Sequence, residues 1–119
     1  MIHIDIKPLS NNEMYGGRKV KSYKYKNFER KLLPLLPEDL EIPKDKMQLY
    51  VAVGLSSKLA DLDNTLKPFI DCLQTKYNFN DKWIYMITAT KTDVKKGEEF
   101  IEFTLEALWV NKLEEHIMI

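Results

Sequence analysis

Hydrophobic and polar residues follow the pattern of β-strands in four stretches of the chain. Residues 2–6 alternate isoleucine with polar residues, which predicts a short half-buried strand. Residues 47–55 are almost continuously apolar and rich in β-branched and aromatic side chains, as is typical of a central strand. Residues 83–91 and 100–106 alternate again, and Lys95-Lys96-Gly97 between them predicts a turn that joins them as an antiparallel hairpin.

A first helix is predicted from Ser22 to about Leu33. Serine is a favourable N-cap residue, because its side-chain oxygen accepts a hydrogen bond from a backbone N–H group of the first turn. Tyr25, Phe28 and Leu32 recur at helical spacing and form the expected buried side. Two prolines close behind Leu33 end the helix.

A second helix is predicted over residues 64–77, where apolar side chains also recur at helical spacing. Pro68 lies inside this range and would break the interior of a helix. If Asp63 or Asn64 caps the helix, Pro68 falls at the boundary of the first turn, where at most one backbone hydrogen bond is lost. The helix dipole then favours carboxylates at this end.

These elements predict an α+β fold. We expect one small domain, residues 1–119, in which a mixed β-sheet of about four strands packs with two main helices. The hydrophobic content of 45% and the charged content of 30% are typical of a globular protein. No apolar run approaches the roughly 18 residues of a membrane-spanning helix, so we expect no membrane partner.

The single cysteine, Cys72, excludes a disulfide within the chain and is typical of a reducing compartment. It lies beside apolar helix positions, which predicts a small core residue. The first seven residues do not have the charge pattern of a signal peptide, since Asp5 lies among the isoleucines and Lys7 follows them. We therefore expect a cytoplasmic protein.

The strongest functional signal is the acidic stretch of residues 61–66, Asp-Leu-Asp-Asn-Thr-Leu. Asp63, Lys67 and Asp71 follow one another at intervals of four, so on a helix they share one face, with Asp61 just before it. A divalent cation commonly offsets the repulsion among such carboxylates, and magnesium beside a lysine is typical of chemistry on phosphate. The alternative is an ordinary charge ladder on a solvated helix.

The net charge of zero conceals a basic N-terminal third. Residues 1–36 carry eight basic and three acidic side chains, giving +5, and the remainder carries ten basic and fifteen acidic ones, giving −5. Seven of the eight basic residues lie at positions 18–31, next to a predicted Gly16-Gly17 hairpin and interleaved with tyrosines. This pattern suits contact with nucleic acid, and simple solvation of a helix is the alternative.

Two other motifs share part of the acidic stretch. An EF-hand calcium loop also begins Asp-x-Asp, but it needs glycine and glutamate where this chain has Leu66 and Cys72. The first motif of haloacid-dehalogenase-type phosphatases is similar to residues 61–66. Those enzymes carry the motif near the start of a Rossmann-like domain, and the 53 residues that follow it here are too few for the rest of such a domain.

Most of the chain resembles the RusA family of Holliday junction resolvases, small phage and prophage endonucleases that cut four-way DNA junctions as homodimers with magnesium. The matching residues of the central part are Asp61-Leu62-Asp63-Asn64, Lys67, Pro68, Asp71, Leu73 and Asn80-Asp81 before a strand. At the N-terminus, a strand ending in residues 7–10 is followed by Asn12, a basic Gly-Gly turn and a helix, as in the family.

The resemblance implies a RusA-like fold and a magnesium-dependent endonuclease that serves DNA recombination and repair. Asp61, Asp63 and Asp81 would bind one or two Mg²⁺ ions, or Mn²⁺ in their place, and Lys67 would complete the catalytic set. Asp71 would orient Lys67 or a metal-bound water. The residues implied to contact DNA are Asn12, Arg18, Lys19, Lys21, Lys24 and Lys26.

The chain departs from the family pattern at one position of the motif. Many members have consecutive acidic residues where this chain has Asn80-Asp81. Two alternatives therefore stay open. One is a non-catalytic dimer of the same fold that binds DNA junctions, and the other, a poorer match, is a small metal-dependent phosphatase.

Overall fold

The computed structural model describes residues 1–17 and 20–108. The helices and strands of this part are β1 (Ile2–Ile4), α1 (Tyr23–Leu32), β2 (Met47–Leu55), α2 (Leu66–Tyr77), β3 (Ile84–Asp93) and β4 (Phe100–Ala107). Short 3-10 helices lie between them: η1 (Asn11–Glu13), η2 (Leu33–Leu35), η3 (Asp63–Thr65) and η4 (Asp81–Trp83). No helix in these residues is long and apolar enough to cross a membrane.

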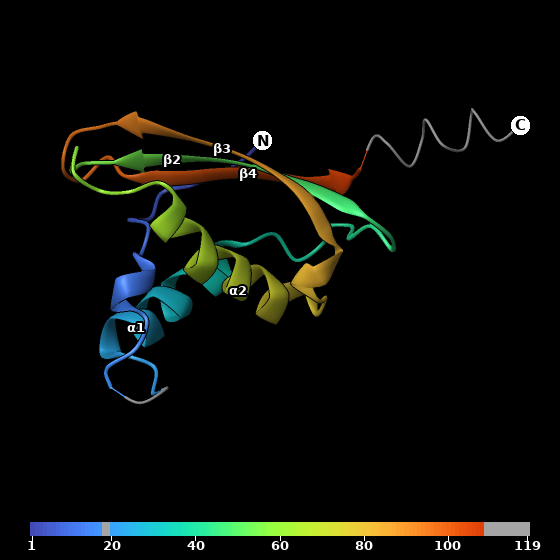
Figure 1. Cartoon of the computed structure of the whole chain (residues 1–119), viewed down its shortest axis with the longest axis horizontal. Coiled ribbons are helices and arrows are strands. Elements are labelled where there is room, and N and C mark those ends of the chain that lie inside the picture. The colour runs from blue at the N-terminus through green and yellow to red at the C-terminus, as the bar shows by residue number, and fades with distance from the viewer. Residues whose placement is uncertain (18–19, 109–119) are drawn as a thin grey trace, which may run out of the picture.

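The four strands form one mixed sheet in the order β1-β4-β2-β3. β2 is parallel to β3 and antiparallel to β4, and β1 is antiparallel to β4. Both helices lie on the same side of the sheet (Figure 1). The predicted α+β fold, with a mixed four-stranded sheet and two main helices, is confirmed.

The predicted hairpin of β3 and β4 is wrong. The two strands follow one another in the chain but lie on opposite sides of β2, which takes the central position expected from its apolar sequence. The predicted turn does form, since the Glu98 N–H donates to the Lys95 carbonyl at 2.9 Å. However, the segment crosses the end of β2, where the Val94 N–H donates to the Leu55 carbonyl at 3.0 Å. The turn residues therefore correctly predicted where the chain reverses, but they did not predict which strand β4 pairs with.

The core lies between the sheet and the helices. Phe69 of α2 meets Phe103 of β4 edge-on, with 5.2 Å between ring centroids. Cys72 is buried, as predicted, and burial raises the pKa of its thiol to about 12, so the thiol stays protonated and inert. The other strand residues of this core include Leu49, Val51, Val53, Ile101 and Leu105.

The two helices begin in different ways. α1 starts as predicted, because the Ser22 hydroxyl oxygen accepts a hydrogen bond from the Tyr25 N–H at 3.0 Å. The expectation that Asp63 or Asn64 caps α2 is wrong. α2 is continuous with η3 and its N-cap, Thr65, makes no capping bond, because the Thr65 hydroxyl donates back to the carbonyl of the η3 N-cap residue at 2.7 Å. Pro68 still lies in the first turn of α2, where its missing N–H has no intrahelical partner to lose.

Candidate functional site

The acidic stretch follows the end of β2 and lies next to the edge strand β3. After β2 the chain runs through a loop, residues 56–62, into η3 and α2. Asp61 and Asp63 are exposed, and both line an open groove of about 690 Å³. The other residues of this groove are Leu62, Leu66, Ile87, Ala89 and Lys91. The sequence motif thus places two carboxylates on a groove that the loop and η3 share with β3.

Asp61 and Asp63 have few protein partners. Asn64 Nδ2 donates to Asp61 Oδ2 at 3.4 Å, which is long for a hydrogen bond. The Asp63 carboxylate has no hydrogen bond or ion pair with any of residues 1–17 and 20–108. Most acceptor sites of the two carboxylates are therefore open to water or to a cation.

Asp71 of α2, in contrast, is surrounded by donors. Lys67 Nζ lies 3.1 Å from Oδ1 and 3.4 Å from Oδ2, the ion pair expected from the spacing. Gln74 Nε2 donates to Oδ1 at 3.3 Å, and the hydroxyl of the buried Tyr25 makes a long hydrogen bond to Oδ2 at 3.5 Å. The hydrogen bond to Asp71 raises the pKa of the Lys67 ammonium, which keeps it charged. Asp71 thus fixes Lys67 and ties α2 to α1.

Asp81 is the first residue of η4, beyond the end of α2, and it is linked through Gln74 to Asp71, the partner of Lys67. The Asp81 N–H donates to Gln74 Oε1 at 2.9 Å, and Gln74 in turn donates to Asp71. Its charge is also among the causes that raise the pKa of Lys67, after the contact with Asp71. Asn80 caps η4 by accepting the Lys82 N–H at 2.9 Å, so this asparagine has a structural role at the position where the RusA pattern often has an acid.

The predicted metal ligands divide into a pair and a separate residue. Asp61 and Asp63 share the groove, which Asp81 does not line. Within residues 1–17 and 20–108, no three or more His, Cys, Asp or Glu side chains are grouped so that they could hold a metal ion. Mg²⁺ keeps several waters and needs only one or two carboxylates plus substrate phosphate. The open oxygens of the Asp61–Asp63 pair fit such an ion.

Asp61 also lines a second cavity, of about 320 Å³, that reaches the N-terminal part of the chain. Asn12 of η1 lines this cavity, together with Lys7. The Asn12 side chain has no hydrogen bond to another described residue, whereas its N–H donates to Ser10 Oγ at 3.3 Å. The structure therefore brings one predicted DNA contact, Asn12, to the acidic stretch from a distant part of the sequence.

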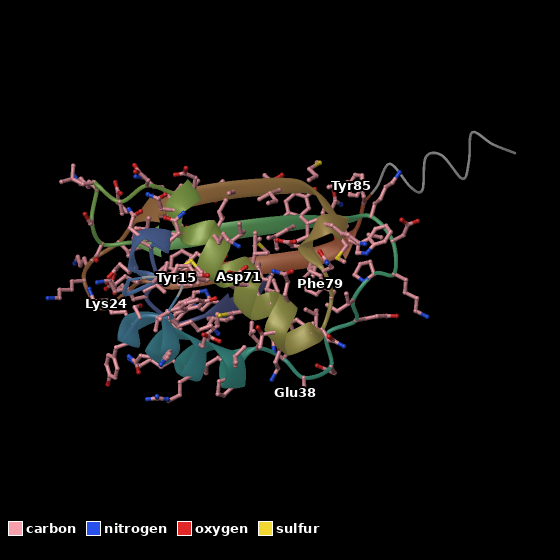
Figure 2. The ribbon with its side chains drawn as sticks, turned by 60° about the horizontal axis from the view of Figure 1, so that its bottom comes forward. Tyr15, Lys24, Glu38, Asp71, Phe79 and Tyr85 are labelled. Carbon is pink, nitrogen blue, oxygen red and sulfur yellow. The ribbon has the colours of Figure 1, made fainter. Side chains whose placement is uncertain are left out.

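Described residues on either side of the predicted Gly16-Gly17 turn pair with each other. Tyr15 and Lys21 pair across it as an antiparallel bridge, and the second glycine has φ of 98°, which other residues rarely adopt. The ring of Tyr15 meets that of Tyr25 edge-on, with 6.2 Å between centroids. Because Tyr25 also reaches Asp71, Tyr15 lies on the Lys67 side of the site, and Figure 2 labels Tyr15 and Asp71.

Two of the lysines predicted to contact DNA are already paired. Lys21 Nζ lies 2.9 Å from Glu29 and 5.1 Å from the ring centroid of Tyr25. Lys24 Nζ lies 2.8 Å from Glu13. Each hydrogen bond to a glutamate raises the pKa of its lysine, so both ammonium groups remain charged while their fields are partly compensated.

The remaining predicted contacts are less constrained. Lys26 is exposed on α1 and makes no ion pair with the described part of the chain. Arg18 and Lys19 lie outside the described residues. Lys26 is therefore the one cation of the predicted DNA-binding set that residues 1–17 and 20–108 leave without a protein partner.

Lys91 of β3 is a site residue that the sequence pattern did not single out. It lines the groove of the acidic pair, and its Nζ donates to the Ala60 carbonyl at 2.9 Å. The register pairs it with the buried Val53 of β2. The alternation of β3 places Lys91 on the same face as Ala89, which also lines the groove.

Comparisons with known proteins leave the family of the chain open. A scan against protein-family models finds no match, and a search of curated proteins finds none either. The case for a function therefore rests on how the side chains are arranged.

Proposed function

We propose that this protein is a magnesium-dependent, structure-specific endonuclease that cuts four-way DNA junctions by phosphodiester hydrolysis, in recombination and repair. One observation carries the proposal. Two exposed carboxylates with almost no protein donors, Asp61 and Asp63, share a groove, and Asp71 holds the charged Lys67 one helical turn farther on. Open carboxylates that are followed one helical turn later by a fixed cation are suited to chemistry on a phosphodiester.

In this proposal Asp61 and Asp63 would hold Mg²⁺, or Mn²⁺ in its place, and Asp81, which lies outside their groove, would be the third carboxylate of the site. When bound, the ion polarises the scissile phosphate and lowers the pKa of the attacking water. Lys67 stabilises the charge that develops on the phosphate oxygens or on the leaving group. Its contacts with Asp71 restrict the rotation of the side chain before substrate binds, so less conformational entropy is lost on binding.

The basic N-terminal part binds the DNA backbone in this proposal. Of the lysines predicted to contact DNA, Lys26 has no protein partner in the described residues, and Lys21 and Lys24 retain charge beside their glutamates. Arg18 and Lys19 add charge at the hairpin in the sequence. Contacts of this kind position DNA without reading its sequence, and they weaken as salt rises.

A homodimer completes the proposal, because a four-way junction offers two equivalent strands and a twofold dimer offers two equivalent sites. The outer edge of β3 supports it, since no described strand covers this edge and residues 84–90 carry no charge.

Sedimentation tests whether two copies pair through β3. We expect the parent protein to be a dimer. The Thr88→Lys variant, which places like charges on the paired edge, should be a monomer. Thr104→Lys on β4 is the matched control and should remain dimeric, so dissociation of both variants or of neither would count against pairing through β3.

A cleavage assay tests the enzymatic proposal. Purified protein is incubated with a labelled four-way junction and with a matched linear duplex, with and without Mg²⁺. We expect Mg²⁺-dependent paired cuts in the junction alone. Asp63→Asn should abolish cutting and leave junction binding intact, whereas Asp39→Asn, an exposed aspartate outside both cavities, should behave as the parent protein.

The other outcomes identify the alternatives. Junction binding without cuts in either metal would show a non-catalytic binding protein. Hydrolysis of small phosphate esters, with no preference for branched DNA, would show a phosphatase. Cutting by the Asp63→Asn variant at the parent rate would remove Asp63 from the metal site.

A further inference from the structure

Lys91 connects the edge strand β3 to the loop that carries the acidic pair. Its Nζ donates to the carbonyl oxygen of Ala60 at 2.9 Å and lies 3.5 Å from that of Lys58. Ala60 immediately precedes Asp61, so the ammonium is bonded to the peptide unit that begins the acidic stretch. Lys91 makes no ion pair with residues 1–17 and 20–108, and main-chain carbonyls are its partners there.

The loop has little else to hold this segment in place. Its first part is tied to the β3–β4 connection through Ser56, whose hydroxyl donates to Glu99 at 2.8 Å. Within the loop, the Ala60 N–H donates to the Ser57 carbonyl at 3.2 Å, which bends the segment but does not attach it to the sheet. Leu59 is 93% exposed, whereas the small side chain of Ala60 is partly buried against the core. A hydrogen bond from an ammonium is stronger than one between neutral groups, and the bonds from Lys91 are the hydrogen bonds that tie residues 58–60 to β3.

We propose that Lys91 is a positioning residue for the metal site. By holding the Ala60 carbonyl against β3, it sets the direction in which Asp61 leaves the loop and keeps that carboxylate in the groove with Asp63. The proposal rests on the proposed function, because it takes Asp61 and Asp63 as the magnesium ligands. Outer residues that orient metal ligands typically contribute 10–100-fold to metal affinity.

The test compares three variants with the parent protein. Lys91→Met removes the donor, and Lys91→Arg retains one. Lys58→Met is the matched control, because it removes a lysine of the same loop while the Lys58 carbonyl still accepts the bond from Lys91. Three quantities are measured: Mn²⁺ affinity by electron paramagnetic resonance, the Mg²⁺ concentration that half-saturates junction cleavage, and hydrogen exchange at the amides of residues 58–62.

For Lys91→Met we expect Mn²⁺ affinity to fall on the order of tenfold. The half-saturating Mg²⁺ concentration should rise to match, the rate at saturating Mg²⁺ should stay near that of the parent, and exchange in the loop should be faster. Lys91→Arg should recover most of the affinity, and Lys58→Met should match the parent. Unchanged metal affinity and exchange in Lys91→Met would overturn the proposal, as would an equal loss in Lys58→Met, which would indicate lost charge rather than lost positioning.

Failure of this proposal can be told apart from failure of the proposed function. If the parent protein cuts no junction but Lys91→Met still binds Mn²⁺ more weakly and exchanges faster, the positioning role holds and the nuclease activity is wrong. If the parent protein cuts junctions and Lys91→Met has the same metal affinity and exchange, the nuclease activity holds and the positioning role is wrong.

Discussion

Asp71 follows the Asp61–Asp63 pair closely in the chain, yet the surroundings of these carboxylates are opposite. Asp71 accepts hydrogen bonds from Lys67, Gln74 and Tyr25. The pair accepts a single long hydrogen bond. The difference separates a carboxylate whose acceptor sites are largely filled from two whose acceptor sites are open to water or a cation, and formal charge or spacing alone does not distinguish them.

The two environments also predict different responses to mutation. A carboxylate that holds donors contributes to the folded state, and its removal leaves those donors without an acceptor. Two exposed carboxylates near one another repel, and a cation relieves that repulsion, so removing one of them should not destabilise the fold. Measurements of stability and of the response to metal should therefore distinguish Asp71 from the Asp61–Asp63 pair.

The largest effect on stability is expected at Asp71. Asp71→Ala leaves the buried Tyr25 hydroxyl and the Lys67 ammonium without their acceptor, which should lower the free energy of unfolding by about 2 kcal/mol. Urea denaturation measures the change, with Asp39→Ala as the control. The variant should still cut junctions at a reduced rate. Complete loss of cutting at full stability would make Asp71 a ligand itself and end the comparison.

A smaller effect is expected when metal is added or removed. At a Mg²⁺ concentration ten times its dissociation constant, the parent protein should gain about 1.4 kcal/mol in unfolding free energy, and a chelator should remove this gain. Asp71→Ala should show the same gain from its lower baseline, and Asp61→Asn should show almost none. Thermal denaturation with and without EDTA measures this. Equal gains in unfolding free energy in all three proteins would show that the ion binds at a site that does not need Asp61.

The smallest effect concerns pH. Because Asp71 raises the pKa of Lys67 above its ordinary value of 10.5, the ion pair stabilises the fold fully below that value and is lost as pH rises through the raised one. The stability difference between the parent protein and Lys67→Met should thus be constant from about pH 6 to 9 and shrink in stronger base. In an Asp71→Asn background the same substitution should change little. If this stability difference varied between pH 6 and 9, a titrating group other than Lys67 would be responsible.

Much of the fold could be predicted from periodicity. The four strands, both helices and the Ser22 cap follow from local patterns, and so does the burial of Cys72. The partner of β4 could not be predicted, because a turn signal fixes where the chain reverses and not which strand it passes on the way. The start of α2 was also missed, since Thr65 bonds back into η3 and does not cap the helix.

The site shows the same division. The i,i+4 spacing correctly predicted the contact of Lys67 with Asp71, because both residues lie on one helix. Spacing could not show that Tyr25, from a helix forty-six residues earlier, shares Asp71, or that Lys91 reaches the loop from β3. Those contacts depend on how distant elements pack, which no local pattern encodes.

The bond between Lys91 and the Ala60 carbonyl also bears on the order in which the protein folds. The two residues are 31 apart, and β2, the acidic loop and α2 leave the ribosome before β3 does. Until β3 docks beside β2, the loop lacks its tie to the sheet, and that docking must first overcome the entropy of closing the intervening chain. A nascent chain would therefore acquire an ordered acidic site only when β3 pairs with β2, which delays the site to a late stage of folding.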